Sequence, residues 1–468
     1  MSTPTKAPSG TLDRVFHLSE RHTDVKTEII AGVTTFMTMA YILAVNPDIL
    51  SASGMDKGAV FTATCIASIL ATVLMAVFSN YPFVLSAGMG LNAYFAFTVC
   101  GNMGYSWQMA LAAVFVEGVI FILLSLTKVR EAIFNAIPMP LKHAVSAGIG
   151  LFIAFIGLQN CKLVVENAST KVSVYNWHNN AAIFNTEGIT VLLAVIGVLI
   201  TAVLVVKRVK GNILWGILAT WLLGIICELV GLYVPNPDMG FFSVLPNFTS
   251  GFGVPSILPT LGQVDFSALI SGKWLDFLVV VFAFLFVDMF DTLGTLIGVA
   301  SKADMLDKDG KLPKIRGALL ADAVGTSAGA LLGTSTITTF VESASGVSEG
   351  GRTGLTGLVS AALFGVALFL SPIFLAIPSF ATAPALIVVG FLMVSAVLKI
   401  DLNNPFEGIP AFICIMAMPF MYSISEGIAM GTISYVVINL FGGKERRKTI
   451  SIVMYILAIL FVLKYILI

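Results

Sequence analysis

The chain has 468 residues, of which 57% are hydrophobic and only 11% are charged. Because soluble domains carry about 25% charged residues, this composition predicts a polytopic membrane protein. The 26 basic residues equal the 26 acidic ones, which excludes a nucleic-acid-binding protein with a dominant basic surface. Five scattered cysteines without a CxxC pair and four dispersed histidines predict no metal site and no cofactor.

Two sets of seven apolar stretches follow the polar first 27 residues. The first set lies near 28–50, 59–79, 83–100, 107–126, 143–160, 189–206 and 211–234. The second set lies near 274–300, 317–333, 338–350, 354–371, 379–398, 408–422 and 425–441. Several are shorter than the roughly 20 residues that a full helical span needs. One more stretch, 450–467, leaves open whether it crosses the membrane.

Lysine and arginine residues gather on one side of these predicted spans. Four precede the first span, and further clusters lie near 128–130, 207–210, 302–316 and 444–448. If each stretch crosses once, all of these clusters fall on the side of the N-terminus, which is therefore predicted to be cytoplasmic. An odd number of crossings separates the two sets, so they begin on opposite sides and are expected to form an inverted repeat.

The chain is expected to be an all-α polytopic membrane protein, with short strands only in the third and tenth segments. These segments, the third of each set, are interrupted at a comparable place. In the first half, Gly88 and Gly90 allow a turn, and Asn92 is expected at the start of the half-helix that follows. In the second half, the β-branched run 334–341 predicts a short strand that ends at Glu342. Paired broken spans in corresponding positions are typical of secondary transporters with the site between the halves. The alternative is that the two glycines only permit close helix packing.

Acidic residues inside the spans are the strongest candidates for a site, because a charge at membrane depth is costly. Asp288 and Asp291 lie three residues apart in one predicted span, so both carboxylates are expected on one helical face. One of them carries a proton or both contact polar groups, and Asp291 alternatively bonds the backbone of a neighbouring broken helix. Glu342 adds an acid from another element. Such acids, with the amide of Asn92, suit a flat heterocycle with alternating donors and acceptors.

The predicted site therefore has two overlapping sets of residues. The predicted substrate-binding residues are Glu342, Asp288, Asn92, Ser343 and Thr339. The predicted proton-coupling residues are Asp288, Asp291 and Glu342, with Asp288 favoured as the proton carrier and Glu342 held closer to the substrate.

Two other polar groups have simpler interpretations. Glu349 lies near Arg352, and a local ion pair between them is expected at the cytoplasmic end of their segment. In the first span, Thr34 and Thr38 are four residues apart and Tyr41 continues the same face. For these three side chains, packing and hydrogen bonds to the backbone are favoured over a role in binding.

Five stretches together resemble the AzgA-like purine permease branch of the nucleobase cation symporter-2 superfamily. They are 32–47, 87–93, 148–160, 290–295 and 342–353. The resemblance extends over essentially the whole chain. It implies fourteen segments in two inverted sevens and proton-coupled uptake of adenine, guanine or hypoxanthine. By motif, the functional positions of the family fall on Asn92, Asp288, Asp291 and Glu342.

The resemblance also implies a division of the chain into a core domain that holds the substrate and a gate domain. Segments 1–4 and 8–11 would form the core, and segments 5–7 and 12–14 the gate. The expected ranges are 1–27 for a cytoplasmic segment, 28–130 and 241–372 for the core, 131–240 and 373–448 for the gate, and 449–468 for a C-terminal hydrophobic segment.

The main hypothesis is a purine–proton symporter of the cell membrane, not an enzyme, in which the core moves against the gate like an elevator. An anion transporter of the SulP type has the same architecture, but its site is usually free of acids so that helix N-termini attract the anion. An intramembrane aspartyl protease would need a Gly-x-Gly-Asp on a second helix, which the sequence lacks. The preferred purine, sodium in place of the proton, and a homodimer are left open.

Overall fold

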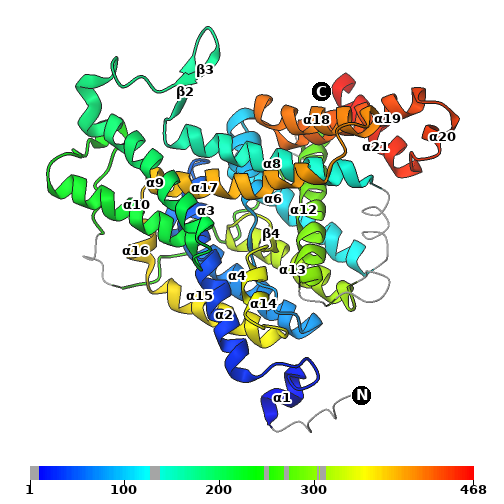
Figure 1. Ribbon diagram of the computed structural model, residues 1–468, viewed down its shortest axis with the longest axis horizontal. Coiled ribbons are helices and arrows are strands. Elements are labelled where there is room, and N and C mark those ends of the chain that lie inside the picture. The colour runs from blue at the N-terminus through cyan, green and yellow to red at the C-terminus, as the bar shows by residue number, and fades with distance from the viewer. Residues whose placement is uncertain are drawn as a thin grey trace.

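The computed structural model describes residues 10–126, 137–246, 252–267, 274–302, 305 and 312–467. These residues are mostly helical, as Figure 1 shows. The elements before residue 240 are α1 Thr11–Phe16, α2 Val25–Met39, α3 Ile42–Ser51, α4 Lys57–Ser79, β1 Leu85–Ala87, α5 Met89–Ala93, η1 Tyr94–Asn102, α6 Trp107–Ser125, α8 Met139–Asn160, β2 Val164–Asn167, β3 Lys171–Val174, η2 Ala181–Ile183, η3 Phe184–Gly188, α9 Ile189–Val206, α10 Asn212–Leu229 and η4 Pro237–Met239. The later elements are α12 Trp274–Lys302, α13 Ile315–Leu332, β4 Ile337–Thr339, α14 Ser343–Ser348, α15 Gly354–Leu368, α16 Ser371–Leu375, α17 Ser379–Val394, η5 Ser395–Lys399, α18 Pro405–Phe420, α19 Ile424–Phe441, α20 Lys444–Arg447 and α21 Ile452–Leu467.

The helices confirm a multi-pass membrane protein. Within the described ranges, nine helices are long and apolar enough to cross a membrane, and Gly354–Leu368, Pro405–Phe420 and Ile452–Leu463 are shorter apolar helices. The order α2–α3, α4, β1–α5 in the first half recurs as α12, α13, β4–α14 in the second. This order agrees with the predicted two sets of seven. The basic cluster at 128–130, most of the cluster at 302–316 and the predicted boundary at 130/131 lie outside the described residues.

The two short strands predicted in the third and tenth segments are confirmed. They pair antiparallel at the centre of the fold, with Leu85 opposite Thr339 and Ala87 opposite Ile337. Every residue of both strands is buried, so their backbone groups depend on this pairing for hydrogen bonds. Each strand leads into a short half-helix, α5 or α14. The hairpin β2–β3 was not predicted; it projects from the body in Figure 1.

The glycines of the first break allow close packing around it. Gly88 precedes α5 with φ −71° and ψ 124°, a conformation that any residue adopts. A Cβ on Gly88 would lie 3.0 Å from Thr338 Oγ1, and one on Gly90 would lie 2.8 Å from Ile149 Cγ2. The break is present, but the two glycines serve it by close packing rather than by backbone freedom. The half-helix begins at Met89, so Asn92 lies inside α5 rather than at its start, which corrects that expectation.

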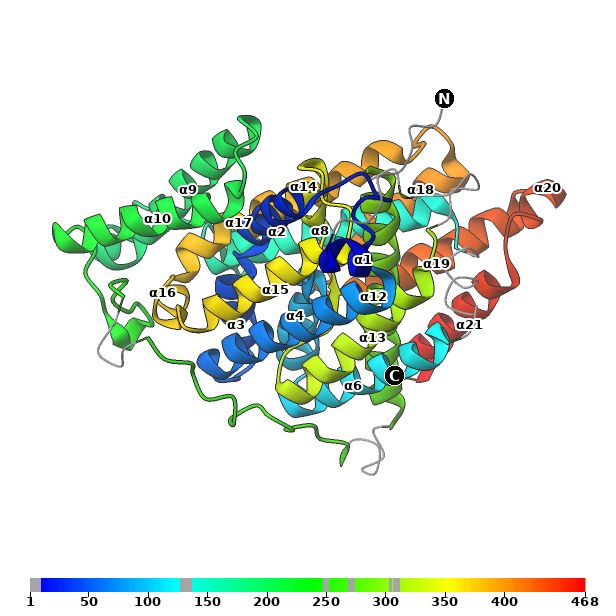
Figure 2. The same cartoon turned by 90° about the horizontal axis from the view of Figure 1, so that it is seen from below.

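The helices form two groups. In one group α4 packs against α13 and α15, α2 against α15, and α6 against α12 and α13. In the other group α8 packs against α17 and α18, and α9 against α10 and α17. Figures 1 and 2 show α9 and α10 at one end of the molecule and α20 and α21 at the other. The first group holds the strand pair, because β1 contacts α4 and β4 contacts α12 and α13.

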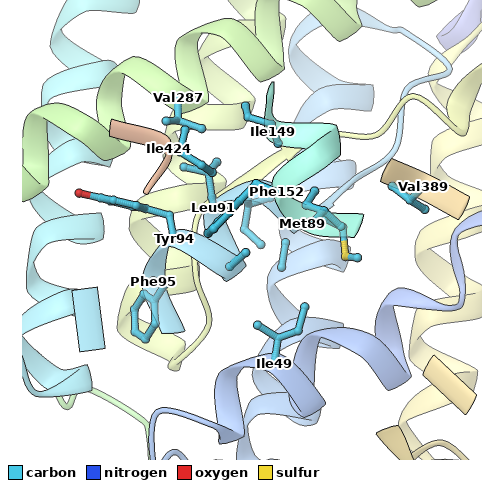
Figure 3. Close-up of a cluster of buried hydrophobic side chains, with 14 of the residues drawn as sticks. Ile49, Met89, Leu91, Tyr94, Phe95, Ile149, Phe152, Val287, Val389 and Ile424 are labelled. Carbon is cyan, nitrogen blue, oxygen red and sulfur yellow. The ribbon is translucent and has the colours of Figure 1, made fainter. Parts of the chain in front are cut away.

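The half-helix α5 forms an apolar contact between these two groups. Figure 3 shows Leu91 and Tyr94 of α5 and η1 beside Ile149 and Phe152 of α8, with Ile424 of α19 close by. All five side chains are at most 3% exposed. The Tyr94 hydroxyl lies within hydrogen-bonding reach of Ser425 in α19, and the rest of this contact is apolar. An apolar contact leaves few buried polar groups unpaired when the two surfaces slide against each other.

The C-terminal helix α21 lies beside α19. The turn at α20 joins the end of α19 to the start of α21, and Tyr465 near the end of α21 donates a hydrogen bond to Glu426 in the first turn of α19. The two helices are therefore antiparallel. Phe461 also packs against Phe282 and Phe286 of α12. The stretch 450–467 thus forms an apolar helix in addition to the predicted fourteen segments.

Candidate functional site

Glu342 lies between strand β4 and half-helix α14, at the predicted break. Its side chain is partly exposed, and its Oε1 accepts a hydrogen bond from the Tyr41 hydroxyl at 2.7 Å. The next residue, Ser343, is fully buried and its hydroxyl accepts a bond from the backbone N–H of Val84 at 3.0 Å. The hydrogen bond of Ser343 therefore links the two broken segments to each other. This contact keeps Glu342 at the end of the strand.

Asp291 of α12 belongs to the same group of side chains. It is partly exposed, and Thr338 of β4 donates to its Oδ2 at 3.4 Å. Its carboxylate lies close enough to Glu342 and to Tyr41 for electrostatic interaction. Two acids from different elements, α12 and the start of α14, thus meet beside the end of β4 and remain accessible.

Asp288 lies in a different environment from Asp291, although both are on α12. It is completely buried, and the single Thr292 hydroxyl bridges its Oδ1 at 2.8 Å and Asp322 Oδ1 at 2.9 Å. Glu117 of α6 is also completely buried and lies within hydrogen-bonding reach of Asp288. The helical spacing of three therefore does not bring Asp288 to the accessible acids.

Glu117 and Asp322 were not among the predicted site residues. Thr336 donates to Glu117 Oε2 at 3.0 Å, which ties this carboxyl to the chain just before β4. Asp322 of α13 interacts electrostatically with both Asp291 and Glu117. A row of five carboxyl groups therefore runs from the accessible pair into the buried interior. The signal that could have found the two missed residues is an acid inside an apolar span.

Asn92 lies at the other end of the strand pair. It is completely buried, and Ser335, two residues before β4, donates to its Oδ1. Glu342 follows the opposite end of β4, so the strand separates the two side chains. Among the described residues, Asn92 Nδ2 and Thr339 Oγ1 have no hydrogen-bond partner. Because buried polar groups are normally paired, both atoms are available to a bound molecule or to water.

Two smaller expectations are resolved by the contacts. The predicted ion pair between Glu349 and Arg352 is wrong, because Glu349 pairs with Lys210 at 2.5 Å and Arg352 donates to backbone carbonyls, including that of Val347 at 2.6 Å. The Thr38 hydroxyl donates to the backbone carbonyl of Thr35 at 2.8 Å, as expected. Tyr41 departs from this expectation, because its hydroxyl donates to Glu342 rather than to the backbone.

Within the described part of the chain, no group of three or more histidine, cysteine or acidic residues could hold a metal ion.

Comparison with known proteins gives a consistent result. The model of a permease family matches residues 26–430. The chain is 47% identical to the permease MJ0326 of Methanocaldococcus jannaschii, over 97% of this chain and 98% of that protein. It is 44% identical to the guanine/hypoxanthine permease PbuO of Bacillus subtilis, over 96% of this chain and 98% of that protein. It is 40% identical to the adenine permease AdeP of Escherichia coli, over 97% of this chain and 96% of that protein.

Solved structures with the same fold include two other transporters. The transmembrane domain of the cyanobacterial bicarbonate transporter BicA matches with a TM-score of 0.60 at 14% identity, over 86% of this chain and 97% of that domain. The murine anion transporter Slc26a9 matches with a TM-score of 0.60 at 12% identity, over 94% of this chain and 74% of that protein. At these identities the similarity concerns the fold alone.

Proposed function

Because the chain belongs to the nucleobase cation symporter-2 superfamily of permeases, we propose that it carries purine nucleobases across the cell membrane by proton symport. The observation that carries the proposal is the pair of accessible acids, Glu342 and Asp291, at the strand-to-helix break. The close relatives named adenine or guanine/hypoxanthine permeases support a purine as the substrate.

The chemistry of the break suits a purine. Carboxylate oxygens accept hydrogen bonds from ring N–H and exocyclic amino groups, and an unpaired amide N–H2 or a hydroxyl can donate to a ring nitrogen or carbonyl. Glu342 and Asp291 offer acceptors at one end of β4, whereas Asn92 offers a donor at the other end. In this proposal Glu342 and Asp291 bind the substrate directly. Asp288 carries the coupling proton at the buried end of the row of carboxyl groups.

An anion transporter is the second candidate, because two structural neighbours with this fold carry anions by name. The acids weigh against it. A negatively charged substrate would meet the carboxylates of Glu342 and Asp291 at the half-helix, where their repulsion opposes the attraction of the helix N-terminus. A neutral nucleobase avoids this cost.

The first prediction tests the substrate class. Cells that express the protein are expected to take up radiolabelled hypoxanthine saturably, and unlabelled adenine, guanine or hypoxanthine should compete. Bicarbonate and sulfate should not compete, because they cannot donate to two carboxylates. Saturable uptake of an anion, with no purine competition, would contradict the proposed function.

Proton coupling is supported by the carboxyl groups behind the accessible pair. Glu117, Asp288 and Asp322 lie close together and completely buried. Three like charges in such a place repel one another, so a shared proton stabilises the group. Movement of the core (28–130 and 241–372) against the gate (131–240 and 373–448) is supported by the two helix groups and the apolar contact of α5. A cytoplasmic N-terminus and a homodimer stay predictions.

The second prediction tests the coupling ion. Purine uptake is expected to rise as the external pH falls, because the proton is a co-substrate and its binding follows its concentration. A protonophore should suppress the uptake, and an imposed inward proton gradient should restore it in proteoliposomes. Uptake that follows a sodium gradient and ignores the protonophore would show that the coupling ion is not the proton.

The third prediction concerns Asn92, whose amide nitrogen is unpaired. Asn92→Ala removes this donor without adding bulk, and an unmatched polar group costs about 1–3 kcal/mol. If the amide binds the purine, the inhibition constants for adenine, guanine and hypoxanthine should weaken about ten- to a hundredfold, with a changed order of preference. If Asn92 only packs with Ser335, the protein level falls and the order of preference stays the same. An unchanged profile at normal expression removes Asn92 from the site.

A further inference from the structure

Tyr41 connects the first membrane segment to the accessible acids. It lies in the two-residue link between α2 and α3. Pro47 lacks an N–H, so it cannot donate to the Leu43 carbonyl, and this loosens the helix near the link. The Tyr41 side chain is only 1% exposed, and its hydroxyl donates to Glu342 Oε1 at 2.7 Å across 301 residues of sequence.

The contact is specific to this tyrosine. A buried tyrosine hydroxyl normally finds a partner, and the one found here is a carboxylate that accepts a charge-assisted bond. The nearest hydroxyl on the same helix face, that of Thr38, already donates to the carbonyls of Thr34 and Thr35 at 3.2 and 2.8 Å. It is therefore committed to its own backbone. Tyr41 also lies close enough to Asp291 for electrostatic interaction, so both accessible acids lie near it.

We propose that Tyr41 is a positioning residue for purine binding, an inference that rests on the proposed function. Its hydroxyl holds Glu342 Oε1, so that the remaining acceptor capacity of this carboxylate is directed at the purine. A carboxylate has about four lone-pair directions, so one bond from Tyr41 leaves room for a substrate N–H. The assignment makes the first segment part of the site, together with α12 and the break at β4–α14.

The reason for such a residue is pre-organisation. A glutamate side chain rotates about three bonds, and fixing it only when the substrate binds reduces affinity. The Tyr41 ring has two rotatable bonds and is packed on all sides, so its hydroxyl is a fixed point. Holding Glu342 before the purine arrives removes part of the ordering cost. Loss of the hydroxyl should therefore weaken binding more than it slows transport.

The test compares Tyr41→Phe with Tyr81→Phe at equal expression. Tyr81 is also buried, at 2% exposed, but packs against Phe83 and Arg21 away from the accessible acids. Tyr41→Phe is expected to raise the KM for hypoxanthine about tenfold and to leave Vmax within about twofold. Tyr81→Phe should leave both unchanged. A purely structural role would instead lower Vmax through the amount of folded protein and leave KM as it was.

A double-mutant cycle with purified protein shows whether the effect passes through Glu342. Equilibrium binding of radiolabelled hypoxanthine is measured for Tyr41→Phe, Glu342→Gln and the double variant. The loss from Tyr41→Phe should shrink to less than about threefold when Glu342 is glutamine. Independent, multiplying losses contradict the assignment, and so does an unchanged KM in Tyr41→Phe. If Glu342→Gln binds too weakly to measure, the change in KM decides alone. Absence of hypoxanthine binding by the wild-type protein contradicts the proposed function instead.

Discussion

Glu342→Ala is expected to abolish saturable purine uptake while the protein still reaches the membrane in normal amounts. The substitution removes the acceptor at the strand-to-helix break and the partner of the Tyr41 hydroxyl. Because Glu342 is partly exposed, water can replace these bonds in the empty protein, so folding should survive. Water cannot replace the hydrogen bonds that Glu342 makes to the purine, so the affinity for the purine should fall about a hundredfold or more.

Glu349→Ala is the matched control, because it removes the same side chain seven residues later. Glu349 pairs with Lys210 between the two helix groups, away from the strand end, and an exposed ion pair is worth at most about 1 kcal/mol. Its loss should leave KM unchanged. Glu342→Gln should keep part of the binding if the carboxylate acts by accepting hydrogen bonds rather than by its charge. Near-normal uptake by Glu342→Ala would remove this residue from the site.

The broken segments could be predicted from sequence because their signals are local. A run of β-branched residues interrupts the apolar pattern before Glu342, and glycines interrupt it before Asn92. Close packing by the glycines was one of two interpretations, and the sequence could not decide between them because the packing partners, Thr338 and Ile149, lie far away in sequence. The same holds for the start of α5, which the pairing of β1 with β4 sets at Met89.

The candidate site was predicted only in part, for a related reason. An acid in an apolar span is visible in sequence, which identified Asp291 and Glu342, but its neighbours are not. Whether Asp288 or Asp291 faces the break depends on which of them contacts Thr338 and which contacts Thr292. Helical spacing of three cannot decide between them. Tyr41 was visible only as part of a polar helix face, and a role in binding was disfavoured there, since its contact with Glu342 spans 301 residues of sequence.

Glu28 leads to the prediction with the largest expected effect on folding. This carboxylate is completely buried in the first turn of α2, where it caps the start of α15 in the other half of the chain. It accepts bonds from the Arg352 N–H at 2.8 Å and the Thr353 hydroxyl at 2.8 Å. It also accepts from the N–H and the hydroxyl of Thr356 at 3.1 and 2.6 Å. The negative charge is favourable there because it lies at a helix N-terminus.

Glu28→Ala is therefore expected to lower the free energy of unfolding by about 3–5 kcal/mol, because it leaves several buried donors unpaired at once. Since folded proteins are stable by only about 5–15 kcal/mol, the variant should be present at a small fraction of the normal level. Fluorescence-detected size exclusion after heating measures this as a large drop in the melting temperature. Glu28→Gln should recover part of the stability, because its amide oxygen still accepts. Glu20→Ala, at a side chain that is 71% exposed, is the control and should change nothing. A Glu28→Ala protein that is fully stable but inactive would mean that Glu28 acts in transport, since a helix cap cannot be lost without a cost in stability.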